Sequence, residues 1–414
     1  MPDMPSPLPQ HAPMTQFPVS HGELMLGDMR LSILAARVGQ TPFYAYGRSQ
    51  LRQRVTELRQ ALPTKIRLHY AMKANPMPAL VHFMAGLVDG IDVASAGELK
   101  VALDAGFSPR VISFAGPAKR DAELRQAVAA GVLVNIESFR EVDVLAQASQ
   151  SLGLPARAAV RINPDFELKS SGMKMGGGPK PFGVDVEHVP DLLANMRRAG
   201  LQFEGFHLYP GSQSLSTQAI CEALQQSFDL AVRLADHAPD KVRVLNLGGG
   251  LGVPYFPGDQ RLQLRPIADQ LERLQQLAQA QLPYAALTLE MGRYLVAEAG
   301  IYVTRVVDRK FSREQLYLMV DGGLHHHLAA TGNLGQVLRK NYPVAIGNKM
   351  DAPASQVTSV VGPSCTPLDV LADRVLLPEA QVGDLVVIFQ SGAYGASASP
   401  HQFLSHPSCL EVLV

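Results

Sequence analysis

The chain has 414 residues, with 37 Lys plus Arg and 37 Asp plus Glu, so its formal net charge is zero. A neutral chain has no overall field that would draw it to nucleic acid or to an acidic membrane surface. A composition of 47% hydrophobic and 18% charged residues indicates a globular protein and excludes wholesale disorder. Three cysteines cannot build a disulfide framework, and no apolar run reaches the roughly 18–20 residues of a membrane-spanning helix. We expect a soluble cytoplasmic protein of enzyme size.

The chain begins with a proline-rich stretch that lacks the apolar segment of a signal peptide. We predict a disordered tail over residues 1–20.

Between residues 48 and 288, short apolar segments of strand length alternate with amphipathic helical segments. The predicted strands cover 66–71, 91–94, 111–114, 132–136, 158–162, 203–208, 242–247 and 287–290, with helical patterns between them at 78–83, 96–105, 120–130 and 215–235. Continuous apolar runs are typical of parallel strands covered on both faces. Eight such units in about 240 residues predict an α/β fold, a (β/α)8 TIM barrel. A doubly wound open sheet is the alternative that periodicity leaves open.

A second domain follows the barrel. The segments 301–307, 316–320, 356–361 and 384–389 are β-rich, are separated by Gly-Asp and Gly-Pro turns, and have no long helices between them. We predict an all-β domain built from residues 289–414 together with 21–47, which include a β-rich segment around 41–45.

Polar residues stand at the C-terminal ends of the predicted barrel strands, where the active sites of such barrels lie. Lys73 follows the first strand, and a buried lysine is costly unless it is paired or used covalently. A lysine that reaches solvent is the more common case. Asp92 in the second strand has a turn-capping role as its alternative, and Arg161 in the fifth has a structural ion pair.

The last three predicted strands end in residues suited to a phosphate. His207 is followed by a Gly-Ser turn at Ser212, and Gly248-Gly-Gly250 directly follows the seventh strand. Glycines without a Cβ let backbone N–H groups approach a phosphate, although a tight turn would need them as well. The run is not a dinucleotide fingerprint, because Val253 stands where a glycine is required. The eighth strand ends in Glu290-Met-Gly-Arg293.

A lysine, a glycine-rich cradle, an acid and a histidine at one barrel mouth suit one kind of cofactor. A small phosphorylated aldehyde that forms a Schiff base with lysine would use all of them.

The motifs, taken in order, resemble the fold-type III pyridoxal-phosphate decarboxylases, which include the diaminopimelate, ornithine and arginine decarboxylases. The resemblance rests on Tyr70-Ala-Met-Lys-Ala-Asn75, on the His207 to Gln213 turn, on the triple glycine, on Glu290-x-Gly-Arg293, on Gly362-Pro-Ser-Cys365 and on Ser391-Gly-Ala-Tyr394. It covers roughly residues 40–410 and implies a barrel joined to a β-domain.

The resemblance also implies roles for single residues. Lys73 would carry pyridoxal 5'-phosphate as a Schiff base, and Glu290 would keep the ring nitrogen protonated, which favours decarboxylation over racemization. His207 would stack on the ring. The phosphate would be held by Ser212, Gly249, Gly250, Gly292, Arg293 and Tyr394, while Asp92 and Arg161 would surround Lys73 and the ring hydroxyl.

Cys365 would come from the partner subunit of a head-to-tail homodimer with shared active sites, and would protonate the quinonoid carbanion. The alternative for a lone cysteine is a small buried hydrophobic residue.

The residues around Cys365 bear on the substrate. Diaminopimelate and ornithine decarboxylases place a carboxylate directly after this cysteine to receive the distal ammonium of the substrate, and this chain has Thr366 there. An ammonium buried without its partner loses several kcal/mol. Asp369 could substitute for that carboxylate. Arg293, Arg339 and Tyr342 are the other candidate substrate contacts.

Several runs, including Gly172-Met-Lys174 and Cys365-Thr-Pro-x-Asp369, are most similar to a narrower subgroup. It contains the decarboxylase of butirosin assembly, which acts on a glutamyl group carried by an acyl carrier protein, and an exosortase-associated set. We therefore predict a decarboxylase acting on an amino acid or on a carrier-linked aminoacyl group. Diaminopimelate decarboxylase, an amino-acid racemase and a non-catalytic pyridoxal-phosphate-binding protein are the alternatives.

Two further segments are conspicuous. If His325, His326 and His327 lie on a strand, they alternate between its faces and cannot reach one ion, so we expect no metal site and a polar rim near the active-site mouth. Residues 169–183, rich in Gly and Lys, are predicted to form a mobile lid over an extended substrate.

Overall fold

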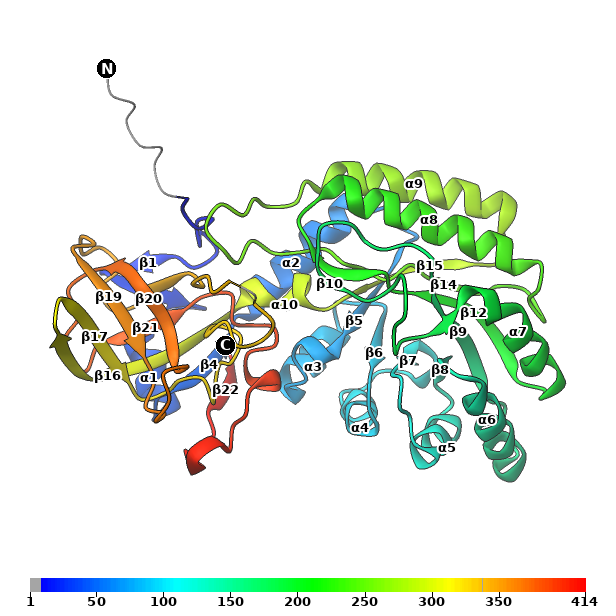
Figure 1. Cartoon of the computed structure of the whole chain (residues 1–414), viewed down its shortest axis with the longest axis horizontal. Helices are drawn as coiled ribbons and strands as arrows, with labels where there is room; N and C mark the ends of the chain where they lie inside the picture. The colour runs from blue at the N-terminus through cyan, green and yellow to red at the C-terminus, as the bar shows by residue number, and fades with distance from the viewer. Residues whose placement is uncertain (1–8, 337) are drawn as a thin grey trace, which may run out of the picture. The chain divides into compact units, whose positions relative to one another are not determined.

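A computed structural model describes residues 9–336 and 338–414 (Figure 1). The chain divides into two compact units. The barrel unit comprises Arg52–Gly252 and Leu262–Leu295. The β-unit comprises the chain up to Leu51, Val253–Arg261 and Val296–Val414.

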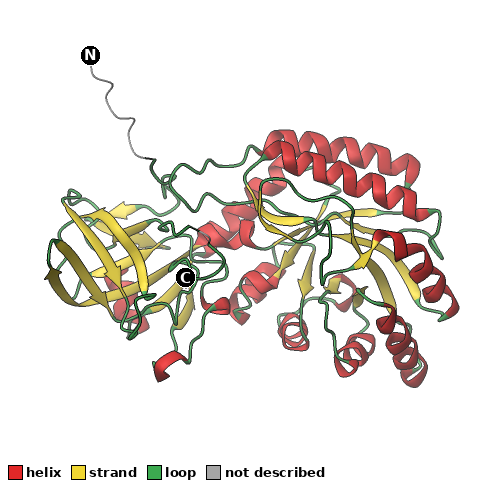
Figure 2. Cartoon of the chain, viewed as in Figure 1, coloured by secondary structure: helices red, strands yellow, loops and turns green. Residues whose placement is uncertain are grey.

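The barrel unit is a closed sheet of eight parallel strands among the described residues, with helices on its outer face (Figure 2). The strands follow the order β9-β12-β14-β15-β5-β6-β7-β8, and β8 pairs with β9 to close the ring. Their bounds are β5 Arg67–Ala71, β6 Gly90–Val93, β7 Ile112–Phe114, β8 Leu133–Ile136, β9 Arg157–Asn163, β12 Gln202–Leu208, β14 Val244–Asn246 and β15 Ala286–Met291. The predicted (β/α)8 barrel is confirmed, and the open doubly wound sheet is excluded.

The helices of the barrel unit begin and end at local signals. The helices are α2 Arg48–Ala61, α3 Pro78–Ala85, α4 Ala96–Asp104, α5 Asp121–Ala130, α6 Phe139–Leu152, α7 Val189–Arg198, α8 Thr217–Ala235 and α9 Leu264–Gln281. Ser95 caps α4 by accepting the Glu98 N–H at 3.1 Å. Gly131 and Gly153 end α5 and α6 in the left-handed conformation, with φ of 72° and 65°.

Polar side chains replace the branched residues that usually fill such a barrel. Alternate residues of a strand share a face, and the register pairs Ala71 with Asp92 and Asp92 with Ser113. Ser113 accepts a hydrogen bond from Asn135 at 2.7 Å, and both residues are buried. The interior is therefore polar at this level.

The β-unit contains a mixed sheet in the order β18-β21-β16-β17-β19-β20, to which β4 and β22 are joined through β16. The bounds are β4 Phe43–Tyr46, β16 Gly300–Ser312, β17 Gln315–Val320, β18 Val344–Ile346, β19 Gln356–Val361, β20 Val370–Leu377, β21 Leu385–Ile388 and β22 Leu410–Leu413. Strand β4 comes from early in the chain and pairs antiparallel with β16, from Gly300↔Tyr46 to Val303↔Phe43. A separate second domain built on a β-sheet is confirmed, although it also contains a helix at Leu31–Val38 and the stretch Val253–Arg261, which we had assigned to the barrel.

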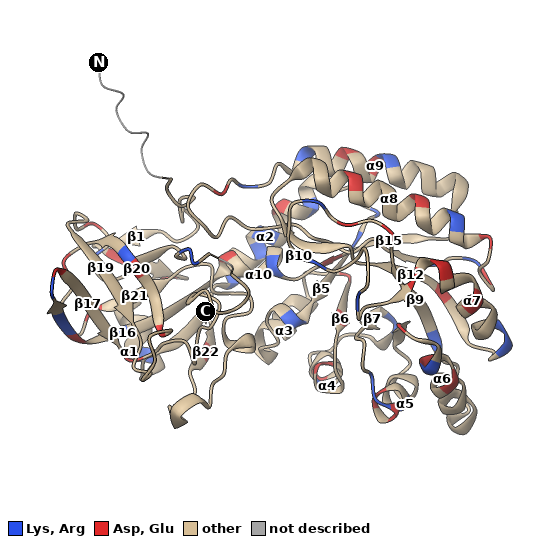
Figure 3. Cartoon of the chain, viewed as in Figure 1, with Lys and Arg blue, Asp and Glu red and all other residues tan. Residues whose placement is uncertain are grey.

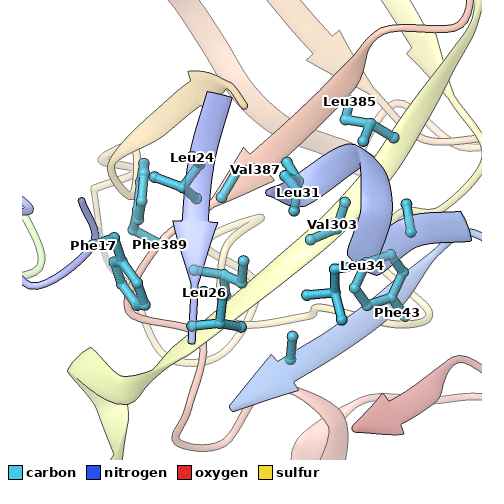
Figure 4. Close-up of a cluster of buried hydrophobic side chains, with 13 residues drawn as sticks. Phe17, Leu24, Leu26, Leu31, Leu34, Phe43, Val303, Leu385, Val387 and Phe389 are labelled. Atoms are coloured by element: carbon cyan, nitrogen blue, oxygen red, sulfur yellow. The ribbon is translucent and has the colours of Figure 1, made fainter. Parts of the chain in front are cut away.

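The early chain completes the core of the β-unit. A hydrophobic cluster joins helix α1 (Leu31–Val38) to β4, β16 and β21 (Figure 4). Phe17 is 3% exposed, and its ring lies 5.8 Å from that of Phe389. Strands β1 Val19–Ser20, β2 Glu23–Leu26 and β3 Met29–Arg30 form a small sheet. Of the predicted tail, residues 1–8 lie outside the described residues, and the chain from Phe17 onward contributes to the fold.

Both basic and acidic residues occur on the outer helices of the barrel unit, as Figure 3 shows for α7, α8 and α9. No helix in the part of the chain that the structure describes has the length and apolar character needed to cross a membrane.

Candidate active site

Lys73 lies in a short 3-10 turn, η1 (Met72–Ala74), that directly follows β5. Its side chain is 39% exposed, and its Nζ atom lies 3.7 Å from Oε1 of Glu290. The same ammonium lies 5.1 Å from the centre of the Tyr209 ring. Lys73 is therefore accessible at the C-terminal end of its strand, with a carboxylate and an aromatic face beside it.

Glu290 and His207 form a buried pair on β15 and β12. They are 5% and 2% exposed, and Nε2 of His207 lies 3.0 Å from Oε2 of Glu290. Burial opposes ionisation of Glu290, but the His207 hydrogen bond and the charge of Lys73 outweigh it and lower the pKa of Glu290 to about 2. Glu290 is therefore a fixed anion, and Nε2 of His207 donates to it.

Asp92 lies on β6 beside His69, with 3.3 Å between its Oδ2 and Nδ1 of His69. Burial is the main cause that raises the pKa of Asp92, and the charge of Glu290 acts in the same direction. The ring of His69 occupies the space that a Cβ at Gly90 would take. His69 directly precedes the Tyr70–Asn75 motif, and we assigned it no role from the sequence. The signal that would have found it is a histidine inside the apolar strand that leads to Lys73.

The glycine turn after β14 brings three backbone segments together. A Cβ at Gly249 would overlap the carbonyl oxygen of Glu290. Gly250 has φ of +90°, and a Cβ there would lie 3.0 Å from the Gly211 carbonyl oxygen. The Ser214 N–H donates to the Gly250 carbonyl at 2.9 Å. Only glycine fits here, because backbone atoms fill the space of a side chain.

Ser212 lies on β13 (Gly211–Ser214) next to this turn. Strand β10 (Ser171–Lys174) pairs antiparallel with β13, and Met173 stands opposite Ser212. The segment predicted as a lid is thus joined by a two-stranded ladder to the strand that carries Ser212. The segment also contains Lys169 and Lys174, which form exposed ion pairs with Glu222 and Glu167.

Gly292 and Arg293 follow β15. Arg293 is the first residue of the short helix α10 (Arg293–Val296). A Cβ at Gly292 would lie 3.0 Å from the Ala71 carbonyl oxygen, so the turn packs tightly on the end of β5. Arg161 is buried at the end of β9, and its Nη1 donates to Glu137 at 2.9 Å.

Buried polar atoms without partners test whether the residues suit a ring cofactor. Among the described residues, Oδ1 of Asp92 and Nδ1 of His207 are buried and make no hydrogen bond. Such groups are costly unless a ligand or water satisfies them. Together with the glycine turn and Lys73, they fit a polar, phosphorylated ring.

The β-unit carries the remaining predicted residues. Cys365 is exposed, and Thr366 is partly buried. Asp369 is 2% exposed and accepts the N–H of Leu324 at 2.6 Å and that of Ser364 at 2.9 Å. Both oxygens of Asp369 are thus used inside the β-unit. We infer that Asp369 shapes the loop around Cys365, and its contact with the substrate stays a prediction.

Arg339, Tyr342 and Tyr394 also lie in the β-unit. Arg339 is exposed and donates to the Val370 carbonyl. Tyr342 is 5% exposed, and its ring centre lies 4.8 Å from that of Tyr255. Tyr394 is half-buried with φ of 56°.

The three successive histidines do not lie on a strand. The segment turns directly after β17, with the N–H groups of His326 and His327 donating to the Gly323 carbonyl at 2.9 Å. All three are at most 1% exposed, so the predicted polar rim is wrong. Burial lowers the pKa of His325 and of His327 to about 3. No group of three or more His, Cys, Asp or Glu residues among those described is arranged to hold a metal ion.

Comparisons with known proteins match this geometry. The family model described as "Pyridoxal-dependent decarboxylase, pyridoxal binding domain" matches residues 48–297. The chain belongs to the pyridoxal-dependent decarboxylases. The resemblance read from the motifs is therefore confirmed, the protein is a decarboxylase, and its cofactor is pyridoxal 5'-phosphate.

Individual pyridoxal-dependent decarboxylases match over most of the chain. The L-glutamyl-[BtrI acyl-carrier protein] decarboxylase of Niallia circulans is 37% identical over 380 residues, which are 90% of this chain and 89% of that protein. The diaminopimelate decarboxylase of Aquifex aeolicus is 33% identical, over 95% of this chain and 91% of that protein. The structure of diaminopimelate decarboxylase from Helicobacter pylori complexed with L-lysine superimposes with a TM-score of 0.81 and 29% identity, covering 92% and 94% of the two chains.

Proposed function

We propose that this decarboxylase removes the α-carboxylate of an amino acid, or of an aminoacyl group linked to a carrier protein, with Lys73 holding the cofactor. The observation that carries the proposal is the position of Lys73 beside the buried Glu290–His207 pair, 3.7 Å from Glu290. A decarboxylase needs an accessible amine next to a permanent anion, and the mouth of the barrel unit supplies both.

Bound pyridoxal phosphate supplies an electron sink for the bonding electrons that departing CO2 leaves at Cα. Lys73 would hold the cofactor covalently through Nζ. Glu290, ionised because its pKa is about 2, would accept a hydrogen bond from the protonated ring nitrogen. His207 would keep that carboxylate oriented and pack against the ring.

The phosphate would bind to the glycine turn. Ser212 and the backbone of Gly249 and Gly250 would donate hydrogen bonds to it, and Gly292, Arg293 and Tyr394 would complete its contacts. The buried carboxylate of Asp92, which lies beside His69, and the guanidinium of Arg161 would lie around Lys73 and the ring hydroxyl.

The proton that replaces CO2 at Cα would come from Cys365 of the partner subunit. Exposure of the Cys365 thiol suits this role, because a proton donor has to reach the reacting atom. The active unit would then be a homodimer with shared sites.

A neutral or extended distal group suits the substrate better than an ammonium. Thr366, which follows Cys365, offers no carboxylate, and Asp369 already accepts two backbone N–H groups. A buried ammonium would therefore lack a dedicated partner and lose several kcal/mol. A glutamyl group carried by an acyl carrier protein meets this requirement. The 37% identity to the L-glutamyl-[BtrI acyl-carrier protein] decarboxylase also supports it.

Diaminopimelate decarboxylase is the second candidate, favoured by the 33% identity over 95% of the chain. A CO2-release assay separates the two. The substrates are free diaminopimelate, lysine, ornithine, arginine and glutamate, and glutamate loaded on an acyl carrier protein. We expect release from the loaded carrier and at least about tenfold less from each free amino acid. Turnover of free diaminopimelate above that of the loaded carrier would establish the second candidate.

A further inference from the structure

Glu137 lies directly after β8, at the C-terminal end of the barrel, and no motif in the sequence drew attention to it. Its side chain is 1% exposed. Oε1 accepts hydrogen bonds from Nη1 of Arg161 at 2.9 Å and from the Gly116 N–H at 2.5 Å. Oε2 accepts the N–H of Gly183 at 3.0 Å. One carboxylate therefore joins the ends of three different segments.

A second buried pair balances the charge of this group. Nζ of Lys119 lies 3.0 Å from Oε1 of Glu141 and 4.0 Å from Oε1 of Glu137. The Glu137 N–H donates to Oε2 of Glu141 at 2.8 Å. Burial opposes ionisation of Glu137, but the charges of Arg161 and Lys119 outweigh it and lower its pKa. Two cations and two anions thus form a neutral buried network.

Gly183 ends the segment predicted as a lid. Its φ is +74°, and a Cβ would lie 2.9 Å from the Arg161 carbonyl oxygen, so the chain passes close to β9 here. The neighbouring Phe182 ring lies 5.1 Å from the Arg161 guanidinium. Directly afterwards, β11 (Val184–Asp185) pairs with β9, Val184 opposite Ile162. The segment is anchored at its C-terminal end to the residues that surround Arg161.

We propose that Glu137 is a positioning residue that fixes two features with one carboxylate: the orientation of the Arg161 guanidinium toward the ring hydroxyl of the cofactor, and the C-terminal anchor of the 169–183 segment at Gly183. The first half rests on the proposed function, because it uses the role of Arg161. The second half depends only on contacts within the barrel unit.

The test compares Glu137→Gln with Glu141→Gln. Both variants remove one buried negative charge from the same network, but Glu141 contacts neither Arg161 nor Gly183 among the described residues. We expect both variants to lower the thermal midpoint. If Glu137 positions Arg161 and Gly183, the two variants should differ in ligand affinity and in tryptic cleavage rate.

The first measurement is the affinity of the apoprotein for pyridoxal phosphate and for an analogue without the ring hydroxyl, by equilibrium dialysis. We expect Glu137→Gln to weaken pyridoxal phosphate by roughly tenfold and the analogue by less than about twofold, because the lost interaction involves the hydroxyl. Glu141→Gln should change both by less than about twofold. Equal weakening of both ligands in Glu137→Gln, or identical behaviour of the two variants, would overturn the first half.

The second measurement is tryptic cleavage of the apoprotein at Lys169 and Lys174. Loss of the Gly183 anchor should raise the cleavage rate at least about fivefold in Glu137→Gln and leave Glu141→Gln at the wild-type rate. An unchanged rate in Glu137→Gln would overturn the second half. This arm contains no cofactor, so it gives its answer even if Lys73 proves not to bind one. If Glu137→Gln does not fold, Glu137→Asp, which is one methylene too short to make both contacts, takes its place.

Discussion

Burial and charge together set the ionisation of Glu290 and the accessibility of Lys73 beside His207. Glu290 keeps its negative charge although it is 5% exposed, because His207 donates to it and Lys73 lies nearby. Lys73 is the most exposed of the three. A permanent anion beneath a reachable amine is the arrangement that a carbonyl cofactor requires.

The charge of Glu290 should appear in the acid stability of the apoprotein. Its pKa in the folded protein is about 2, against an ordinary value of 4.5. Unfolding below pH 4.5 therefore takes up a proton, and the stabilisation present above that pH is lost as the pH falls toward 2. This contribution is on the order of 3 kcal/mol. Urea-unfolding midpoints should fall less steeply with pH in Glu290→Gln than in the wild type between pH 4.5 and 2. Identical slopes would contradict the assignment.

Single-residue predictions from the sequence depended on whether a motif was present. Lys73, Glu290, His207 and the glycines stand in short motifs, and the structure brings Lys73, His207 and Glu290 together. His69 and Glu137 escaped notice, because each belongs to the site through a contact with a residue far away in the sequence. A single sequence does not carry such pairings.

At the scale of elements, the turn after β14 is fixed by the backbone that surrounds it. Gly249→Ala would place a methyl group on the Glu290 carbonyl oxygen and displace either the turn or β15. We expect the affinity for pyridoxal phosphate to fall at least about tenfold, measured by equilibrium dialysis. Gly86→Ala is the control, because a Cβ there meets only the Phe83 carbonyl oxygen, at 3.8 Å. Equal affinities of the two variants would show that the turn does not hold the phosphate.

The loop that carries Cys365 is shaped by Asp369. Asp369→Asn would lose an acceptor for either Leu324 or Ser364. If Cys365 donates the proton, kcat should fall by roughly tenfold or more while KM changes little. Asp373→Asn is the control: its carboxylate lies within β20 and accepts from Ser359. A rise in KM with unchanged kcat would instead restore Asp369 as a substrate contact.

The barrel strands were predicted better than the additional strand β10 and the turn at His325–His327. All eight barrel strands were recovered, because each is a compact apolar run. Strand β10 was not predicted. The histidines at 325–327 were considered as part of a strand, although they form a turn. Strand β10 is mostly exposed and polar, while the histidines are buried in a turn whose form depends on Asp369, 42 or more residues later. Tertiary contacts determine both.

At the scale of the whole molecule, the proposed exchange of Cys365 between subunits predicts complementation. Lys73→Ala and Cys365→Ala should each be inactive alone. Mixed and allowed to exchange, they should form hybrid dimers with one intact site, giving about a quarter of wild-type activity. Mixing either variant with itself is the control. No recovery after verified exchange would show that both residues serve the same subunit.

The central claim, that Nζ of Lys73 binds the cofactor, is tested most directly by trapping. The holoenzyme is reduced with borohydride and digested, and the modified peptide is identified by mass spectrometry. We predict near-visible absorbance before reduction and one pyridoxyl group on Lys73, with none on the buried Lys119. A colourless protein, or a pyridoxyl group on any other lysine with Lys73 unmodified, would contradict the account.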